Sequence, residues 1–204
     1  MVTVFKRKIM KKVAYIFLLF AISIFTGCDT NDDGFYNTVY IDASNLVTFS
    51  NQTDYATGDY FFVDANIPRL LPEVGQTTPV DIYKTTNGAT KIAFSYIIER
   101  RINATDWEVV TINDNEFGII EGSAQSGAYV YGLCLYDSND QVYKYRVGFP
   151  LTATGNYRVS FGYNSSSTNS VELRSISEPK NLIAYIDSTI NNLDNSGYFY
   201  FNVN

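Results

Sequence analysis

Residues 142–149 have the sequence VYKYRVGF, and this stretch decides the fold class. Every second position from Tyr143 to Phe149 is apolar, whereas Lys144 and Arg146 lie between them on the opposite face. Alternation with a period of two residues is typical of a half-buried β-strand. The stretch therefore predicts a strand that turns one face toward a hydrophobic core.

The same alternation recurs before and after this stretch. Residues 92–98 and 157–163 repeat it, and residues 128–136 are apolar on both faces, which predicts a central, covered strand. Residues 181–193 fit either a strand or a helical stripe, and the β-rich surroundings favour a strand. Further strands are predicted at residues 36–42, 60–65, 80–84, 107–112, 171–174 and 198–203.

The connections between these stretches agree with an all-β fold. Asn87 and Gly88 form a two-residue hairpin signal between two predicted strands, and residues 137–140 form a polar turn. Short strands without convincing helices between them predict an antiparallel β-sandwich over residues 36–204. Two small domains that divide near residues 103–105 are the alternative.

Residues 151–157, with the sequence LTATGNY, resemble the corner before a late strand in immunoglobulin-like sandwiches. In that family a tyrosine hydroxyl bonds back to the corner backbone, and the resemblance gives this part to Tyr157. It implies an immunoglobulin-like, antiparallel β-sandwich. The cysteine pair of antibody domains is missing, and Cys134 is expected to be a buried free thiol.

The N-terminus has the pattern of a secretory signal peptide. Five basic residues within residues 6–12 precede the apolar run VAYIFLLFAISIFT at residues 13–26. The uncharged stretch is shorter than the ~20 residues that a membrane-spanning helix needs. We expect residues 1–27 to be a cleaved signal peptide, and an uncleaved anchor helix is the alternative.

The end of this apolar run resembles the lipobox of bacterial lipoproteins. Phe25, Thr26, Gly27 and Cys28 match it, although the family usually has leucine where this chain has Phe25. In that family a peptidase cuts before the cysteine, and its sulfur receives a diacylglyceryl group. The resemblance implies that Cys28 is the lipid attachment site, with ordinary secretion as the alternative. Stable anchoring needs at least two acyl chains, which a lipidated Cys28 would supply.

Residues 28–35 form a short acidic tether. Asp29, Asp32 and Asp33 resemble the signal that sends lipoproteins of the Bacteroidota to the cell surface, and a plain solvated tether is the alternative. The resemblance implies a lipid-anchored protein of the outer membrane, on the cell surface.

The tether also matches the beginning of an EF-hand calcium loop. Asp29, Asn31, Asp33 and Gly34 fit the first positions of that pattern. Tyr40 stands at the twelfth position, where the loop requires a bidentate glutamate. We therefore expect no metal site here, and the sequence predicts no other cofactor.

Charge and composition exclude several function classes. The chain has no histidine, which excludes a Ser-His-Asp or Cys-His catalytic site and any metal site that needs imidazole. Removal of residues 1–27 leaves 10 basic residues against 21 acidic ones, a net charge of −11. Such a surface disfavours nucleic acid as a partner. The membrane, through the lipid anchor, is the first predicted partner.

A non-catalytic binding module is the favoured function, with a glycan or a protein as its ligand. If Phe199 and Phe201 face the core, Tyr198 and Tyr200 stand outward together as candidate ligand contacts, whereas Trp107 is expected in the core. The alternative is a hydrolase, such as a glycosidase, that uses carboxylates alone. Its candidates have no distinctive spacing, and no catalytic residue is assigned: Glu99, Asp106, Glu108, Glu116 and Glu121.

Overall fold

A computed structural model of the chain describes residues 37–165, 167–176 and 182–204. The chain divides into two units, Met1–Phe35 and Tyr36–Asn204, and the described residues belong to the second. The signal peptide, the tether and their candidate residues lie outside the described residues: Phe25, Thr26, Gly27, Cys28, Asp29, Asp32 and Asp33. Within the described part, no helix is long and apolar enough to cross a membrane.

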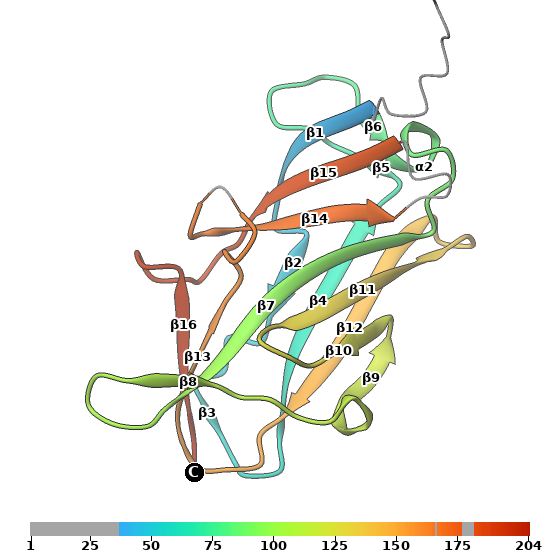
Figure 1. Cartoon of the computed structure of the whole chain (residues 1–204). Helices are drawn as coiled ribbons and strands as arrows, with labels where there is room; N and C mark the ends of the chain where they lie inside the picture. Colours follow the sequence, from blue (N-terminus) through green and yellow to red (C-terminus); the bar gives the residue numbers. More distant parts are fainter. Residues whose placement is uncertain (1–36, 166, 177–181) are drawn as a thin grey trace, which may run out of the picture. The chain divides into compact units, whose positions relative to one another are not determined.

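Strands make up nearly all of the regular structure, which confirms the all-β prediction (Figure 1). The strands are β1 (Asn37–Ser44), β2 (Val47–Phe49), β3 (Asp54–Tyr55), β4 (Tyr60–Pro68), β5 (Leu70–Leu71), β6 (Val80–Asp81), β7 (Lys91–Arg101), β8 (Trp107–Val109), β9 (Gly118–Glu121), β10 (Ser123–Gln125), β11 (Val130–Asp137), β12 (Val142–Pro150), β13 (Gly155–Ser160), β14 (Ser170–Ile176), β15 (Leu182–Thr189) and β16 (Tyr198–Val203). The helical elements are α2 (Ile82–Thr85) and the 3₁₀ turn η1 (Asp114–Glu116).

Most of these strands form one continuous sheet. Its main path is β1-β15-β14-β7-β11-β12-β4-β2, with β10 beside β11 and β9 beside β12. A second branch runs from β7 through β13 and β16 to β3, and β8 also pairs with β7. The strands β5 and β6 form a separate small ribbon.

The strand β7 connects the two branches of the sheet. Its first half pairs with β11 and β14, and its second half pairs with β13 and β8 (Figure 1). The sheet curls, and its two branches pack against each other: Phe61 of β4 stacks on Phe201 of β16 with the ring centroids 4.8 Å apart. Strands before and after residues 103–105 are paired with one another, so the chain does not divide into two sheets at that point.

The core inside this curled sheet is rich in aromatic side chains. The inward positions of β12 and β7 are buried as the alternation predicts, including Tyr96, Tyr143, Tyr145 and Phe149. The buried hydroxyls of Tyr96 and Tyr145 form a hydrogen bond with each other (3.1 Å). This bond avoids the loss of folding free energy that a buried hydroxyl without a partner would cause. Each large apolar side chain buried in this way contributes roughly 1.5–3 kcal/mol.

Two strand pairs differ from the purely antiparallel arrangement that we predicted. The strand β1 pairs in parallel with β15, and β3 pairs in parallel with β16. Both pairs join strands that are distant in sequence, and only a long connection permits parallel pairing. The strand β15 also confirms that residues 182–189 are a strand and not a helix.

The predicted hairpin at Asn87 and Gly88 is wrong. Residues 82–85 form the helix α2, because the Asp81 carboxylate accepts a hydrogen bond from the backbone N–H of Lys84 and caps the helix (3.0 Å). Asn87 and Gly88 have positive φ angles of 51° and 87° and end this helix. The strand predicted at residues 80–84 is therefore reduced to β6.

Three local predictions are confirmed. The Tyr157 hydroxyl donates a hydrogen bond to the backbone carbonyl of Ala153 (2.7 Å), as the corner motif requires. The Asp137 carboxylate accepts a hydrogen bond from the backbone N–H of Asn139 and shapes the turn before β12 (2.9 Å). Cys134 is a buried free thiol, and burial raises its pKa.

Candidate functional site

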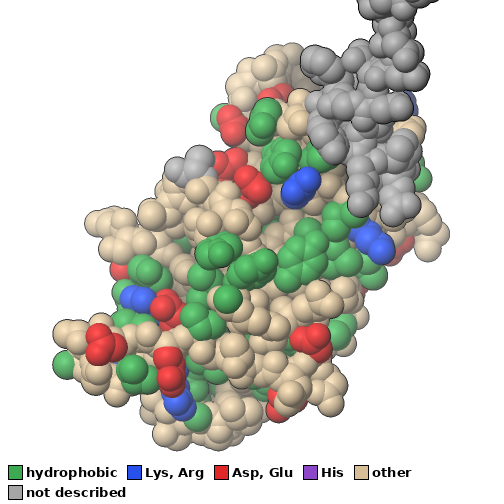
Figure 2. All heavy atoms as spheres, in the orientation of Figure 1, with side chains coloured by type: hydrophobic (Ala, Val, Ile, Leu, Met, Phe, Trp, Pro, Cys, Tyr) green, Lys and Arg blue, Asp and Glu red, His purple; other side chains and the backbone are tan. Residues whose placement is uncertain are grey.

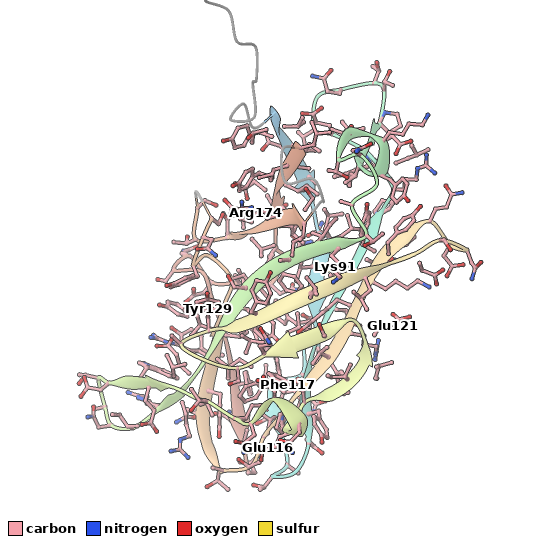
Figure 3. The ribbon with its side chains drawn as sticks, turned by 45° about the vertical axis from the view of Figure 1, so that its right-hand side comes forward. Lys91, Glu116, Phe117, Glu121, Tyr129 and Arg174 are labelled. Atoms are coloured by element: carbon pink, nitrogen blue, oxygen red, sulfur yellow. The ribbon has the colours of Figure 1, made fainter. Side chains whose placement is uncertain are left out.

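An open groove of about 720 Å³ crosses the outer face of β1, β15, β14, β7 and β11. Figure 3 labels Tyr129, next to the beginning of β11, and Arg174 on β14, which both line it. In Figure 2, hydrophobic side chains gather on the middle of the face in view, with basic side chains at the border of the patch. We call the open space along these five strands the groove.

Small side chains on β7 make the floor of the groove. Ala93 lies in register with Arg174 on one neighbouring strand and with Leu133 on the other. Ser95 is likewise in register with Tyr131 of β11. Small residues between larger ones leave a hollow along the middle strand, because cross-strand neighbours on one face stand side by side.

Aromatic rings form both sides of the groove. On one side Tyr185 stacks on Tyr40 with the ring centroids 5.5 Å apart, and the Arg174 guanidinium lies 5.3 Å from the Tyr185 ring. Tyr129 and Tyr131 line the other side. The groove thus offers ring faces on two sides of a narrow floor.

Polar groups accompany these rings. The Asn164 amide donates a hydrogen bond to the Ser95 hydroxyl at the floor (3.1 Å). Burial raises the pKa of Glu172, the nearby charge of Arg174 opposes this rise, and the charge of Asp187 adds to it. Asp187 is the register partner of Glu172 on β15. Hydrogen-bonding groups beside flat apolar surfaces suit a ligand with many hydroxyl groups.

The tyrosines that the sequence singled out lie on a different face. Phe199 and Phe201 are buried, and Tyr198 and Tyr200 point outward with their ring centroids 6.0 Å apart. The predicted alternation along β16 is therefore confirmed. This face lies over β13, β16 and β8 and does not belong to the groove.

A stacked arginine occupies part of this second face. The Arg158 guanidinium lies 4.4 Å from the Trp107 ring and 4.1 Å from the Tyr198 ring, and it holds Glu99 through two hydrogen bonds (2.6 and 3.0 Å). The prediction that Trp107 lies in the core is wrong, since the ring is only partly buried and covers Arg158. Arg158 therefore takes a ring face that a ligand would need.

The carboxylates proposed for a hydrolase do not come together in the groove. Glu99 pairs with Arg158, Glu108 pairs with Arg100 (2.9 Å), and Asp106 accepts a hydrogen bond from Asn103 (2.6 Å). The two others are Glu116, which caps η1, and Glu121, at the end of β9. Among the described residues, no group of three or more His, Cys, Asp or Glu is placed to hold a metal ion.

Sequence reasoning missed the residues of the groove. Residues 128–136 were predicted to be covered on both faces, and β11 does lie centrally between β7 and β12. Its second apolar face, however, is open: Tyr131 lines the groove and Leu135 is 41% exposed. An apolar outward face on a central strand was the signal that could have found this site.

Comparisons with known proteins add no assignment. No family model matches the chain, and neither a curated protein nor a solved structure matches it.

Proposed function

We propose that this protein is a non-catalytic module that binds a glycan chain in the groove. The observation that carries the proposal is the groove itself: tyrosine rings on both sides of a small-residue floor, with amide, hydroxyl and charged groups beside them. A pyranose ring has a flat apolar face of about the size of a tyrosine ring, and its hydroxyls need hydrogen-bonding partners. An open groove across a sheet also admits a chain of sugars.

The module belongs, in this proposal, to a lipid-anchored protein of the cell envelope, exposed on the outer membrane of the cell. Support comes from the sequence alone, through Cys28 with Phe25, Thr26 and Gly27 before it and Asp29, Asp32 and Asp33 behind it. The body belongs to the immunoglobulin-like sandwiches. The hydrogen bond of Tyr157 at the corner and the face-to-face packing of β4 on β16 support this assignment.

Glycan binding can be tested with the purified chain on a glycan array, followed by calorimetry with a bound oligosaccharide. Tyr131→Ala and Tyr185→Ala should each weaken binding roughly tenfold or more, a loss of about 1.4 kcal/mol. Tyr200→Ala is the matched control, since this exposed tyrosine lies on the other face. If only the Tyr200 variant bound the oligosaccharide more weakly, the binding site would lie on the face of β16 and not in the groove.

A second candidate function is hydrolysis of the same glycan. Glu172 has a raised pKa and faces Asp187 across β14 and β15, and two neighbouring carboxylates are the requirement of a glycosidase. Release of reducing ends from the bound oligosaccharide, abolished by Glu172→Gln, would establish it. Binding without release over the same time supports the non-catalytic module.

The lipid anchor has its own test. Metabolic labelling with palmitate should mark the wild-type chain, and Cys28→Ser should remove the label and release the protein from the membrane fraction. Cys134→Ser is the control, because this thiol is buried in the core. A label that persists in the Cys28 variant would contradict the anchor.

A further inference from the structure

The basic side chains of the described residues are almost all engaged within the protein. Ion pairs hold Arg69, Lys84, Arg100, Lys144, Arg146 and Arg158. Arg101 donates hydrogen bonds to the backbone carbonyls of Asn103 and Ala104. Only Lys91 and Arg174 form neither an ion pair nor a hydrogen bond with another described residue. Cations without such a partner among the described residues are unexpected in an acidic protein, where carboxylates outnumber basic groups.

These two cations lie next to each other at the groove. Arg174 lines the groove and is in register with Ala93, whereas Lys91 is in register with Ile176, another lining residue. Lys91 and Arg174 are therefore diagonal neighbours on the outer face of β7 and β14, roughly 7–8 Å apart at the backbone. Figure 3 labels both. Side chains of this length can reach a single anionic group.

The Arg174 side chain is also held ready for a ligand. Its guanidinium lies over the Tyr185 ring, which is itself stacked on Tyr40. Stacking fixes the plane of the guanidinium and leaves its N–H groups without an acceptor among the described residues. A planar fork of donors matches the geometry of a carboxylate or a sulfate.

Charge changes sign along the groove. Glu172 precedes Arg174 by two residues on the same face of β14, and Lys91 lies on the far side of Arg174 from it. One end is thus acidic, and the other end is basic and bordered by Ile176. A ligand that fits both ends carries hydroxyls toward Glu172 and an anionic group toward Lys91.

We infer that the ligand of the groove is an acidic glycan, whose carboxylate or sulfate group binds between Lys91 and Arg174. This inference rests on the proposed function, since it names the class of glycan. Uronic acids and sulfate esters present the same anionic chemistry at this site. A charge-assisted hydrogen bond of this kind changes affinity by about tenfold or more.

The test is a comparison of matched oligosaccharides on the full chain by calorimetry. One arm uses an oligogalacturonate and its methyl ester, and the other uses a sulfated glycan and its desulfated form. We expect at least one acidic member to bind about tenfold more tightly than its neutral counterpart, with affinity that falls as salt is added. The arm that shows the preference identifies the anionic group.

Variants connect this preference to the two cations. Arg174→Gln and Lys91→Gln should each remove most of the preference for the acidic form, and Arg174→Lys should restore only part of it. The control is Lys84→Gln on α2, whose side chain is exposed, pairs with Asp81 and does not line the groove. Equal thermal unfolding of the variants would exclude a folding defect.

The outcomes separate the two proposals. Equal affinity for acidic and neutral forms, or a preference that survives both Gln variants, would overturn the acidic-glycan inference while glycan binding still stands. Failure to bind any glycan would overturn the proposed function, and the inference with it.

Discussion

Tyr157 is held at both ends of its side chain. Its ring stacks on Phe201 in the core, and its hydroxyl donates a hydrogen bond to the carbonyl of Ala153. Tyr157→Phe keeps the ring and removes the donor, so we expect the free energy of unfolding to fall by about 1 kcal/mol. Urea denaturation followed by circular dichroism measures this change.

Tyr163→Phe is the control for the corner at the same scale. Tyr163 is 56% exposed and contacts the Tyr129 ring at the surface. Removal of its hydroxyl should leave the free energy of unfolding within about 0.5 kcal/mol of the wild type. Equal loss in both variants would mean that the bond to Ala153 does not stabilise the corner.

At the scale of elements, Gly122 allows the chain to pass from β9 to β10. Its φ angle is +80°, and a Cβ atom there would lie 2.6 Å from the Leu133 carbonyl oxygen. Gly122→Ala should therefore lower the free energy of unfolding by about 2 kcal/mol or more, since both the backbone conformation and the space oppose it. Thermal and urea unfolding of the purified variant provide the measurement.

Gly127→Ala is the matched comparison in the loop before β11. A Cβ atom at Gly127 would have its nearest neighbour 3.8 Å away, in ordinary contact. We expect a change near zero or a small gain in stability. If the two variants lose the same stability, the close approach at Leu133 does not restrict the chain.

The long strands of this fold were predictable, and most of the short ones were not. Alternation located β7, β12 and β16 and the faces that they bury, because six or more residues repeat the pattern. The strands β3, β5, β9 and β10 have two to four residues, too few for any period to show. The hydrogen bond that the Asp81 carboxylate accepts from the backbone N–H of Lys84 caps a helix where a strand was predicted. The periodicity of apolar residues does not reveal such a local hydrogen bond.

The candidate site was harder to predict than the fold. Tyr198 and Tyr200 were found because they alternate with buried neighbours on a single strand. The groove instead combines single residues of separate strands, such as Tyr185, Arg174 and Tyr131. Their proximity depends on strand order, including the parallel pairing of β1 with β15, and the sequence of one chain does not specify that order.

At the scale of the whole molecule, carboxylates with shifted pKa values set the response of stability to pH. The Lys144 ammonium lowers the pKa of Asp137, so this group contributes stability above about pH 4 that is lost as pH falls further. Burial raises the pKa of Glu172, so its ionisation costs stability at neutral pH, and the cost disappears on acidification. The two groups therefore have opposite signs.

Unfolding by urea between pH 7 and pH 2 tests these signs. In Asp137→Asn, the free energy of unfolding should fall less steeply below about pH 4 than in the wild type. In Glu172→Gln, the free energy of unfolding should gain more over the wild type at pH 7 than at pH 4. A wild-type slope in either variant would mean that the ionisable group does not contribute. Increased stability of the Glu172 variant with weaker ligand binding would indicate that this carboxylate is kept for recognition.

The shared strand β7 determines how the body responds to local opening. Its amides and carbonyls serve partners on both branches, including β11 and β14 below the groove and β13 beneath Arg158. If either branch separated, β7 would lose about half of its hydrogen-bonding partners. We therefore expect the central amides of β7 to exchange with deuterium only when the entire sheet opens. The rings that receive a ligand and the stacked arginine on the other face consequently share one cooperative unit, and a bound ligand would slow exchange at both.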